Sequence, residues 1–217
     1  MKMDDVIIPR EEVASALTHG LGAVASLAGG AVLVTLAAVF GDAWQVVGAS
    51  VFCASLVLLY TASTLYHAVW HRVARPRLQV FDHCAIYVLI AGTYTPFTLV
   101  GLRGGWGWTL FGVVWGLAAA GVVFKLFYTG RFRRLSTFIY LGMGWMSVVA
   151  TGPLVSALPV SALLWLVAGG LSYTAGTYFY LNQRIPYAHA IWHLFVLGGS
   201  ACHFVAVLSQ VVPSGAS

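Results

Sequence analysis

The chain has 217 residues, of which 60% are hydrophobic and only 8% are charged. So few charged side chains cannot cover the water-facing surface of a soluble protein of this length. The composition therefore excludes an ordinary soluble domain and predicts an integral membrane protein. The formal net charge is +5, but no basic patch interleaved with aromatic residues points to nucleic acid as a partner. We interpret the lysines and arginines as charges that orient the protein in a membrane.

The chain begins with a polar stretch of mixed charge, MKMDDVIIPREEVASAL. This stretch lacks the basic, apolar and small-residue regions of a signal peptide, so we expect it to remain on the protein. We predict a cytoplasmic N-terminal segment over residues 1–16, a transmembrane domain over 17–210 and a short tail over 211–217. Cys53, Cys84 and Cys202 lie in apolar sequence without CxxC spacing, which is typical of small buried side chains.

Seven apolar stretches are long enough to cross a membrane, since a helix needs about 20 such residues to span the hydrocarbon. Polar, glycine-containing or proline-containing sequences such as FGDAW, HRVARPRLQ and SALPVS separate them. Long continuous apolar runs favour helices over the short alternating strands of a membrane barrel. We therefore predict an all-α bundle of seven transmembrane helices, over residues 17–40, 44–69, 80–101, 106–128, 135–153, 159–181 and 187–210.

The basic residues test this topology, because seven spans place the N-terminus and the loops after the second, fourth and sixth spans on one side. Those segments and their flanks hold ten of the eleven cationic residues, namely Lys2, Arg10, Arg72, Arg75, Arg77, Lys125, Arg131, Arg133, Arg134 and Arg184. Arg103 is alone on the other side. The positive-inside rule then predicts a multi-pass protein of the plasma (inner) membrane, with a cytoplasmic N-terminus and an outside C-terminus.

Histidines gather near the predicted cytoplasmic side of the bundle. Given the direction of each span, that side holds His19, His67, His71, His83, His189 and His193. His203 is the exception, because it lies ten residues beyond His193 and therefore roughly 15 Å further along the same helix.

Part of this group has the pattern of a zinc site. His189 and His193, four residues apart, lie on one face of a helix and can share one ion, and His67 at similar depth can supply the third ligand. Ser63 lies one turn from His67 on the same face. Asp82 is the one carboxylate near this side in the second to seventh spans, and we expect it to hold the zinc-bound water.

Other readings of these histidines remain open. A single histidine at a helix end commonly lies at the membrane interface with its polar tip among the headgroups, and we assign that position to His71, His19 and His83. The pair itself is not the HExxH motif of soluble zinc proteases, because position 190 is alanine and the general base is absent from that helix.

Four stretches of the chain, EEVASALTHGLG, STLYHAV, FDHCAIYVLIAGTYTPF and AHAIWHLFVLGGSACHF, resemble the hemolysin III family. That family belongs to the wider group of progestin and adipoQ receptors. The similarity runs from Glu11 to about Val207, and the order S-x-x-x-H, D-x-x-x-x-Y, H-x-x-x-H is highly specific for it. The chain departs from the family at Ser15, where asparagine is common.

The resemblance implies a seven-helix protein with a cytoplasmic N-terminus and an intramembrane zinc ion. Its zinc ligands correspond to His67, His189 and His193, and the positions beside the metal to Ser63 and Asp82.

The leading functional hypothesis is a zinc-dependent hydrolase of a membrane lipid, with a ceramide-like amide as substrate by analogy with animal relatives. Bound zinc would lower the pKa of its water and polarise the scissile carbonyl. Asp82 would take the proton and pass it to the leaving amine, and Ser63 would stabilise the oxyanion or fix the water.

Two alternatives come from other functional classes. The first is a non-catalytic receptor or membrane-homeostasis protein in which a structural zinc ties the second and seventh spans together. The second is a hemolysin-type cytolytic protein, which requires a polar lining through both leaflets. The outer halves of the spans argue against a pore, because the charges there, Asp42 and Arg103, lie in loops. The sequence does not indicate a protein partner.

Overall fold

A computed structural model describes residues 9–211. Seven helical segments in this range are long and apolar enough to cross a membrane, which confirms the predicted seven-helix membrane bundle. The helices are α1 (Arg10–Phe40), α2 (Ala43–Ala68), α3 (Ala74–Pro96), α4 (Gly105–Tyr128), α5 (Arg133–Gly144), α6 (Thr151–Ala157), α7 (Val160–Leu181) and α8 (Ala188–Val211). Residues 1–8, the first half of the predicted N-terminal segment with Lys2, and residues 212–217 of the tail lie outside the described residues.

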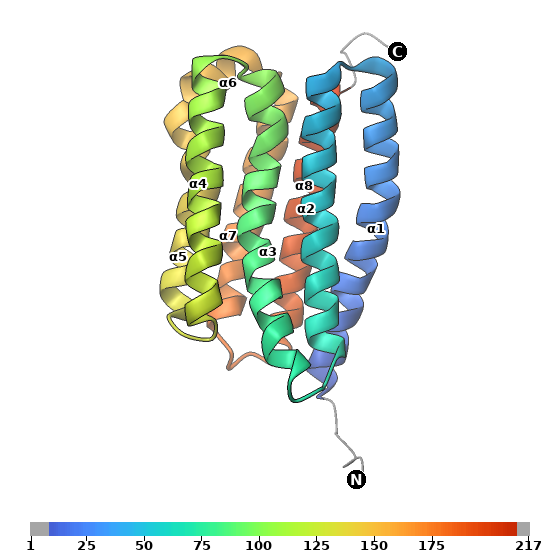
Figure 1. Ribbon diagram of the computed structural model, residues 1–217, viewed down its shortest axis with the longest axis vertical. Coiled ribbons are helices and arrows are strands. Elements are labelled where there is room, and N and C mark those ends of the chain that lie inside the picture. Colours follow the sequence, from blue (N-terminus) through green and yellow to red (C-terminus); the bar gives the residue numbers. More distant parts are fainter. Residues whose placement is uncertain (1–8, 212–217) are drawn as a thin grey trace.

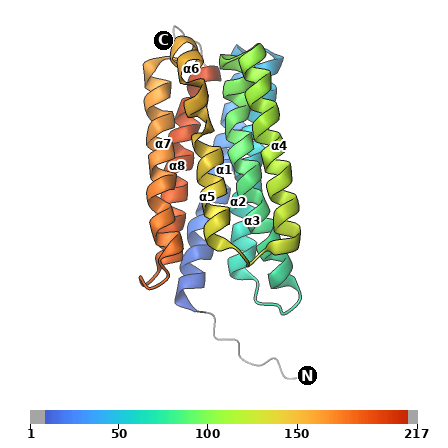
Figure 2. The ribbon, with the colours of Figure 1, turned by 90° about the vertical axis from the view of Figure 1, so that its left-hand side faces the viewer.

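The helices run alternately up and down, with short connections at both ends (Figure 1). We call the end at which α1 begins the proximal end and the opposite end the distal end. Neighbouring helices pack in chain order from α1 to α4, and α8 packs against α7 and α1 and also touches α2 and α3. Figure 2 shows α5 between the α7–α8 pair and the α3–α4 pair. This arrangement brings the end of α2 and the start of α8 together beside α1.

The first helix begins at Arg10, before the predicted start at residue 17. Glu11 and Glu12 therefore lie in its first turn, where carboxylates are favourable next to the unpaired N–H groups of a helix start. The outward face of α1 is apolar and exposed, with Leu17, Leu21 and Val24 each more than half exposed. Such a face suits contact with lipid rather than water.

Small residues allow close approach of the helices. A Cβ atom added at Gly22 of α1 would lie 2.7 Å from Cδ1 of Tyr60 on α2. Gly30 likewise lies against Cys53, which is buried as predicted, while Cys84 and Cys202 are partly buried. Close contact between helices through small residues is the usual packing mode in a membrane, where apolar lipid gives helices no hydrophobic reason to associate.

The fifth span is not one continuous helix. It extends to Ala157, beyond the predicted residue 153, and a 3₁₀ segment, η2 (Trp145–Ala150), interrupts it between α5 and α6. Gly142 and Gly144 weaken the helix before the break, and Pro153 has no N–H to donate to the carbonyl of residue 149. A shorter π-helical turn, η1 (Phe97–Gly101), follows Pro96 at the distal end of α3.

Tyr94 of α3 satisfies backbone groups that this break leaves free. Its hydroxyl oxygen lies 3.0 Å from the carbonyl oxygen of Met143 and 2.7 Å from that of Gly144, and it accepts a hydrogen bond from the Ser147 N–H at 2.9 Å. Inside a membrane no water replaces such partners, so the hydroxyl stabilises the break.

Replacing Tyr94 with Phe should therefore destabilise the bundle by about 1 to 2 kcal/mol, because backbone groups at the break lose a partner that lipid cannot replace. Thermal unfolding in detergent, followed by circular dichroism, measures the loss. Tyr128→Phe is the matched control, since Tyr128 is exposed at the end of α4. Equal unfolding midpoints for the Tyr94→Phe and wild-type proteins would contradict this assignment.

Candidate metal centre

Three histidines from α2 and α8 converge near the proximal end. His189 and His193 lie on successive turns of α8 with ring centroids 4.7 Å apart, and the His67 ring from the last turn of α2 lies 4.9 Å from His189 and 5.0 Å from His193. One ring nitrogen from each residue lies within 4.8 Å of the others. The predicted meeting of these side chains is confirmed, and the group is able to hold a metal ion.

A carboxylate from α1 orients His67. The Nδ1–H of His67 donates to Oε2 of Glu12 at 2.7 Å, and Oε1 of Glu12 accepts from Nη2 of Arg75 at 2.9 Å. The Arg75 guanidinium also lies over the Trp70 ring, 3.7 Å from its centroid. Because Nδ1 carries the proton, Nε2 of His67 presents a lone pair toward the other two histidines.

That Nε2 atom is buried and has no hydrogen-bond partner among residues 9–211. An unpaired buried nitrogen costs free energy comparable to a lost hydrogen bond, and buried polar groups are normally paired. A metal ion at the centre of the three rings would supply the missing partner. A ligating histidine with a carboxylate on its other nitrogen is also the usual arrangement in metal sites. The residues present therefore fit a metal ion.

The backbone of α1 orients His193 in a similar way. Its Nδ1 lies 3.1 Å from the carbonyl oxygen of Ser15 and 3.3 Å from Oγ1 of Thr18. A carbonyl only accepts, so Nδ1 carries the proton and Nε2 is left with a lone pair. The His193 side chain is almost fully buried.

Glu11 fixes the start of α8. Its Oε1 accepts a hydrogen bond from the backbone N–H of His189 at 3.0 Å. The N–H groups of a first helical turn have no partner within the helix, and a carboxylate there also favourably faces the positive end of the helix dipole. Glu11 thus holds the turn that carries His189, while Glu12 on the next position holds His67.

The first helix is what sequence reasoning missed. The predicted site takes its carboxylate from the second to seventh spans, and it does not include Glu11 and Glu12 of α1. A signal was present, because Glu12, Ser15 and His19 follow one another at helical spacing and share one face. Polar groups on one face of an otherwise apolar span indicate a partner inside the bundle.

The predicted interfacial position of His19 is wrong. Its side chain is 3% exposed, and its ring stacks on the His193 ring with centroids 3.4 Å apart and an interplanar angle of 8°. It lies on the inward face of α1, one turn beyond Ser15, and therefore faces α8 rather than the headgroups. His71, by contrast, is exposed, and its Nδ1 accepts from the Ala74 N–H at 3.4 Å at the start of α3.

Ser63, Asp82 and His83 line a cavity together with His189 and His193. Ser63 is buried and its hydroxyl has no hydrogen-bond partner within the described part of the chain. The Asp82 side chain is buried as well. The interfacial position that we expected for His83 is wrong, because its ring lines this cavity with Nδ1 3.5 Å from Oδ2 of Asp82 and 2.7 Å from the Gln79 carbonyl oxygen.

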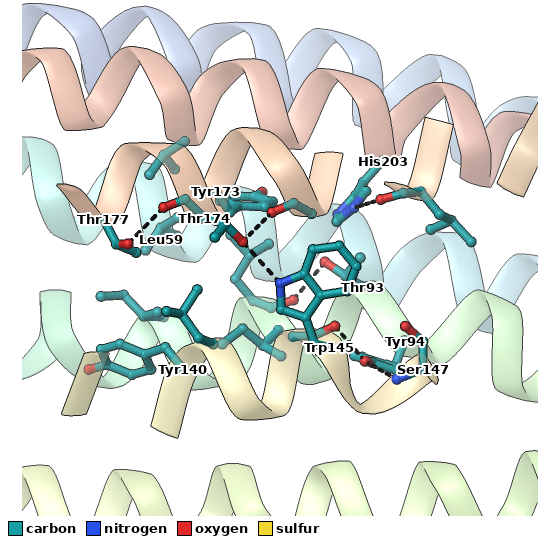
Figure 3. Close-up of a pocket in the computed structure, with 18 of the residues that line it drawn as sticks. Leu59, Thr93, Tyr94, Tyr140, Trp145, Ser147, Tyr173, Thr174, Thr177 and His203 are labelled. Carbon is teal, nitrogen blue, oxygen red and sulfur yellow. Dashed lines mark hydrogen bonds between the residues drawn. The ribbon is translucent and has the colours of Figure 1, made fainter. Parts of the chain in front are cut away.

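The cavity has a volume of about 330 Å³ and continues from the histidines toward the distal end. Its walls are mostly apolar and come from α3, α5, α7, α8 and the break in the fifth span. Figure 3 shows its middle part, where Trp145 extends from η2 toward α7 and its indole N–H donates to Oγ1 of Thr174 at 3.0 Å. His203 lies further along, and its Nε2–H donates to the Leu166 carbonyl oxygen at 3.2 Å. The three-histidine cluster thus lies at one end of a long apolar cavity.

Comparison with known proteins identifies the family of this chain. Residues 8–204 match the family described as Haemolysin-III related. The chain belongs to this family. It is 49% identical over 203 residues to "Hemolysin-3 homolog" of Bacillus subtilis, which covers 94% of this chain and 95% of that protein. No solved structure gives a significant match.

More distant relatives place the haemolysin III chain in the wider receptor group that its motifs resemble. It is 30% identical to human "Monocyte to macrophage differentiation factor" over 206 residues, covering 91% of this chain and 83% of the human protein. Rice "Heptahelical transmembrane protein ADIPOR2" is 37% identical over 97 residues, or 36% of this chain and 41% of that protein. The progestin and adipoQ receptor assignment is therefore confirmed.

The contact between Glu12 and His67 predicts a graded effect on metal binding. Glu12→Gln should weaken binding of a Zn²⁺ probe, and Glu12→Ala should weaken it more, by about 10- to 100-fold, because His67 loses the group that fixes its tautomer and orientation. Competition with a chromophoric chelator measures the dissociation constant. Asp42→Asn, at the distal end, is the control and should leave it unchanged. An unaltered constant in Glu12→Ala would contradict the role of the carboxylate.

Proposed function

We propose that this haemolysin III protein is a zinc-dependent hydrolase of a membrane lipid, with a ceramide-like amide as the substrate class. The observation that carries the proposal is that two of the three clustered histidines, His189 and His193, line one end of a long apolar cavity whose wall also holds Asp82 and Ser63. The cavity volume falls within the range of small-molecule binding sites.

Zinc is the metal that suits these ligands best. Neutral imidazoles are good zinc ligands, and three protein ligands with one open position are typical of catalytic zinc sites. Among the described residues the group offers no thiolate and no carboxylate within the same ligand distance, so it lacks the oxygen ligands that magnesium or calcium require. Zinc bound here would acidify a water molecule at its open position and polarise a carbonyl oxygen.

Asp82 and Ser63 would carry the remaining steps. The Asp82 carboxylate takes a proton from the attacking water as the oxygen of that water bonds to the amide carbon. Asp82 then gives the proton to the amide nitrogen as the carbon–nitrogen bond breaks. The products are a fatty acid and an amine. The Ser63 hydroxyl, which has no partner among residues 9–211, is free to donate to the developing oxyanion. The apolar cavity accommodates the acyl chain and excludes bulk water from the reacting bond.

A second candidate function uses the same site without turnover. The three histidines come from α2 and α8, and α1 holds both helices through Glu12 and Ser15, so a metal ion would tie three helices at the proximal end. In this receptor-like alternative the metal is structural, and Asp82 has no chemical role.

The membrane orientation is part of the proposal. We infer that the proximal end faces the cytoplasm at the plasma (inner) membrane, because the loops at that end hold nearly all the arginines while Arg103 lies at the distal end beside Asp42. The metal site then lies toward the cytoplasmic leaflet.

Elemental analysis of the purified protein tests the metal. We expect about one zinc per chain in the wild-type protein and a loss of most of it in His193→Ala, because two histidines bind zinc far more weakly than three. His71→Ala is the control, since His71 is exposed and lies outside the cluster. A wild-type protein without zinc would remove the basis of the hydrolase mechanism.

The pair Asp82→Ala and His67→Ala separates the enzyme from the structural alternative. In the enzyme, Asp82→Ala keeps its zinc and loses at least about 100-fold in hydrolysis of a ceramide-like lipid amide, since general acid–base catalysis contributes that much. In the structural alternative, Asp82→Ala is nearly silent and His67→Ala lowers the unfolding temperature. A zinc-loaded wild-type protein that hydrolyses no lipid amide or ester, in an assay where active relatives do, would refute the hydrolase.

A further inference from the structure

A second hollow at the proximal end lies outside the metal centre. It is formed where α5 begins and where α7 ends in the loop to α8, and its lining includes Arg133, Arg134, Asn182, Gln183 and Arg184. Figure 2 shows these two helices next to each other at that end of the bundle. None of these five residues belongs to the histidine cluster or to the wall of the apolar cavity.

The hollow carries positive charge that nothing in the described part of the chain neutralises. Its three arginines take part in none of the ion pairs among residues 9–211. Two acidic residues at the same end of the bundle, Glu11 and Glu12, are already engaged by the backbone of His189 and by the side chains of His67 and Arg75. Three guanidinium groups beside one hollow repel one another unless an anion lies between them.

One of the arginines is held in place. Nη2 of Arg133 donates to the carbonyl oxygen of Leu181 at 3.3 Å, at the end of α7 where helix carbonyls lack partners within the helix. Its guanidinium also lies over the Tyr180 ring, 5.6 Å from the centroid. Arg134 and Arg184 are exposed and line the same hollow. A fixed guanidinium with two exposed ones in the same hollow is suited to a phosphate group, which accepts several hydrogen bonds at once.

The start of α5 adds to this preference for an anion. Arg133 and Arg134 are its first two residues and line the hollow, so the positive end of a twelve-residue helix lies at its edge. The amide groups of Asn182 and Gln183 provide further donors on the opposite wall.

The surroundings indicate lipid as the source of the anion. Exposed aromatic side chains flank the hollow, with Phe132 at 57% exposure, Tyr178 at 62% and Tyr187 at 44%. Tyrosines and other aromatics at the ends of membrane spans mark the level of the headgroups. A phosphate bound at this level would have its acyl chains beside α5 and α7, next to Tyr180, which lines the apolar cavity.

We propose that this arginine hollow binds the phosphate of an anionic phospholipid, such as phosphatidylglycerol, as a specific lipid site next to the cavity. The orientation of the protein in the membrane by its basic residues explains why arginines lie at this end. It does not explain why three of them line one hollow, with one hydrogen-bonded to a carbonyl of α7. Clusters of basic residues at span ends are known features of anionic-lipid recognition.

Native mass spectrometry of the whole protein tests the proposal, with phosphatidylglycerol and phosphatidylcholine of identical acyl chains offered at equal concentration. The wild-type protein should retain phosphatidylglycerol in preference. Arg134→Gln/Arg184→Gln should reduce that preference by about tenfold, because two exposed cations near the phosphate are removed. Neither side chain makes a hydrogen bond or an ion pair with another residue of 9–211, so the fold and the zinc content should not change.

Arg77→Gln/Arg131→Gln is the matched control. It removes the same charge from exposed positions at the same end but outside the hollow, and it should keep the wild-type preference. Equal loss in both double variants would show that charge alone attracts the lipid, and no preference in the wild-type protein would also overturn the site. If millimolar inorganic phosphate displaces the lipid completely, the hollow is a phosphate site and the assignment to a phospholipid is wrong. Since zinc content is measured separately, failure here leaves the metal centre unaffected.

Discussion

The Glu12 carboxylate is the contact on which the proximal half of the structure depends. One oxygen accepts from His67 of α2 and the other from Arg75 at the start of α3, so a single side chain of α1 joins three helices. It sets the proton of His67 on Nδ1 and leaves Nε2 directed at the two histidines of α8. Without this partner the imidazole would lie in an apolar bundle with nothing to fix its tautomer.

This contact makes α1 part of the candidate site although none of the three histidines comes from it. Three residues of α1 each hold one of these histidines by a different group: Glu11 by the backbone of His189, Glu12 by the ring of His67, and the Ser15 carbonyl by the ring of His193. The outward face of the same helix is apolar and exposed. A helix with one polar stripe and one lipid-facing side can therefore position three rings from two other helices. The stacked His19 ring extends that stripe by a further turn.

The sequence predicted the parts of this structure that follow from a count or a spacing. Seven apolar runs of the right length predicted the helices, and the spacing of His189 and His193 placed both rings on one face. The placement of His67 followed from the direction of its span. Depth alone did not show which way a ring points, so His19 and His83 were expected at the interface although both face inward. The contacts of α1 were missed because the predicted start of the first span at residue 17 left Glu11 and Glu12 in the N-terminal segment, whereas the helix begins at Arg10.

The break in the fifth span is a second feature that the length of an apolar run does not predict. It also affects which molecules the cavity can hold. A continuous helix would keep its backbone groups paired internally, whereas η2 leaves carbonyls that Tyr94 must satisfy and turns Trp145 toward Thr174 of α7. These polar contacts lie at mid-depth in an otherwise apolar cavity. A hydrocarbon chain therefore meets fixed hydroxyl and indole groups partway along its path from the histidines. A lipid with a single polar group at its reacting end gains most by placing that group at the metal centre, because the groups at mid-depth already have partners. If a lipid is the substrate, as proposed, the cavity would favour an orientation with the polar end of the lipid beside Asp82 and its hydrocarbon chain along the apolar walls.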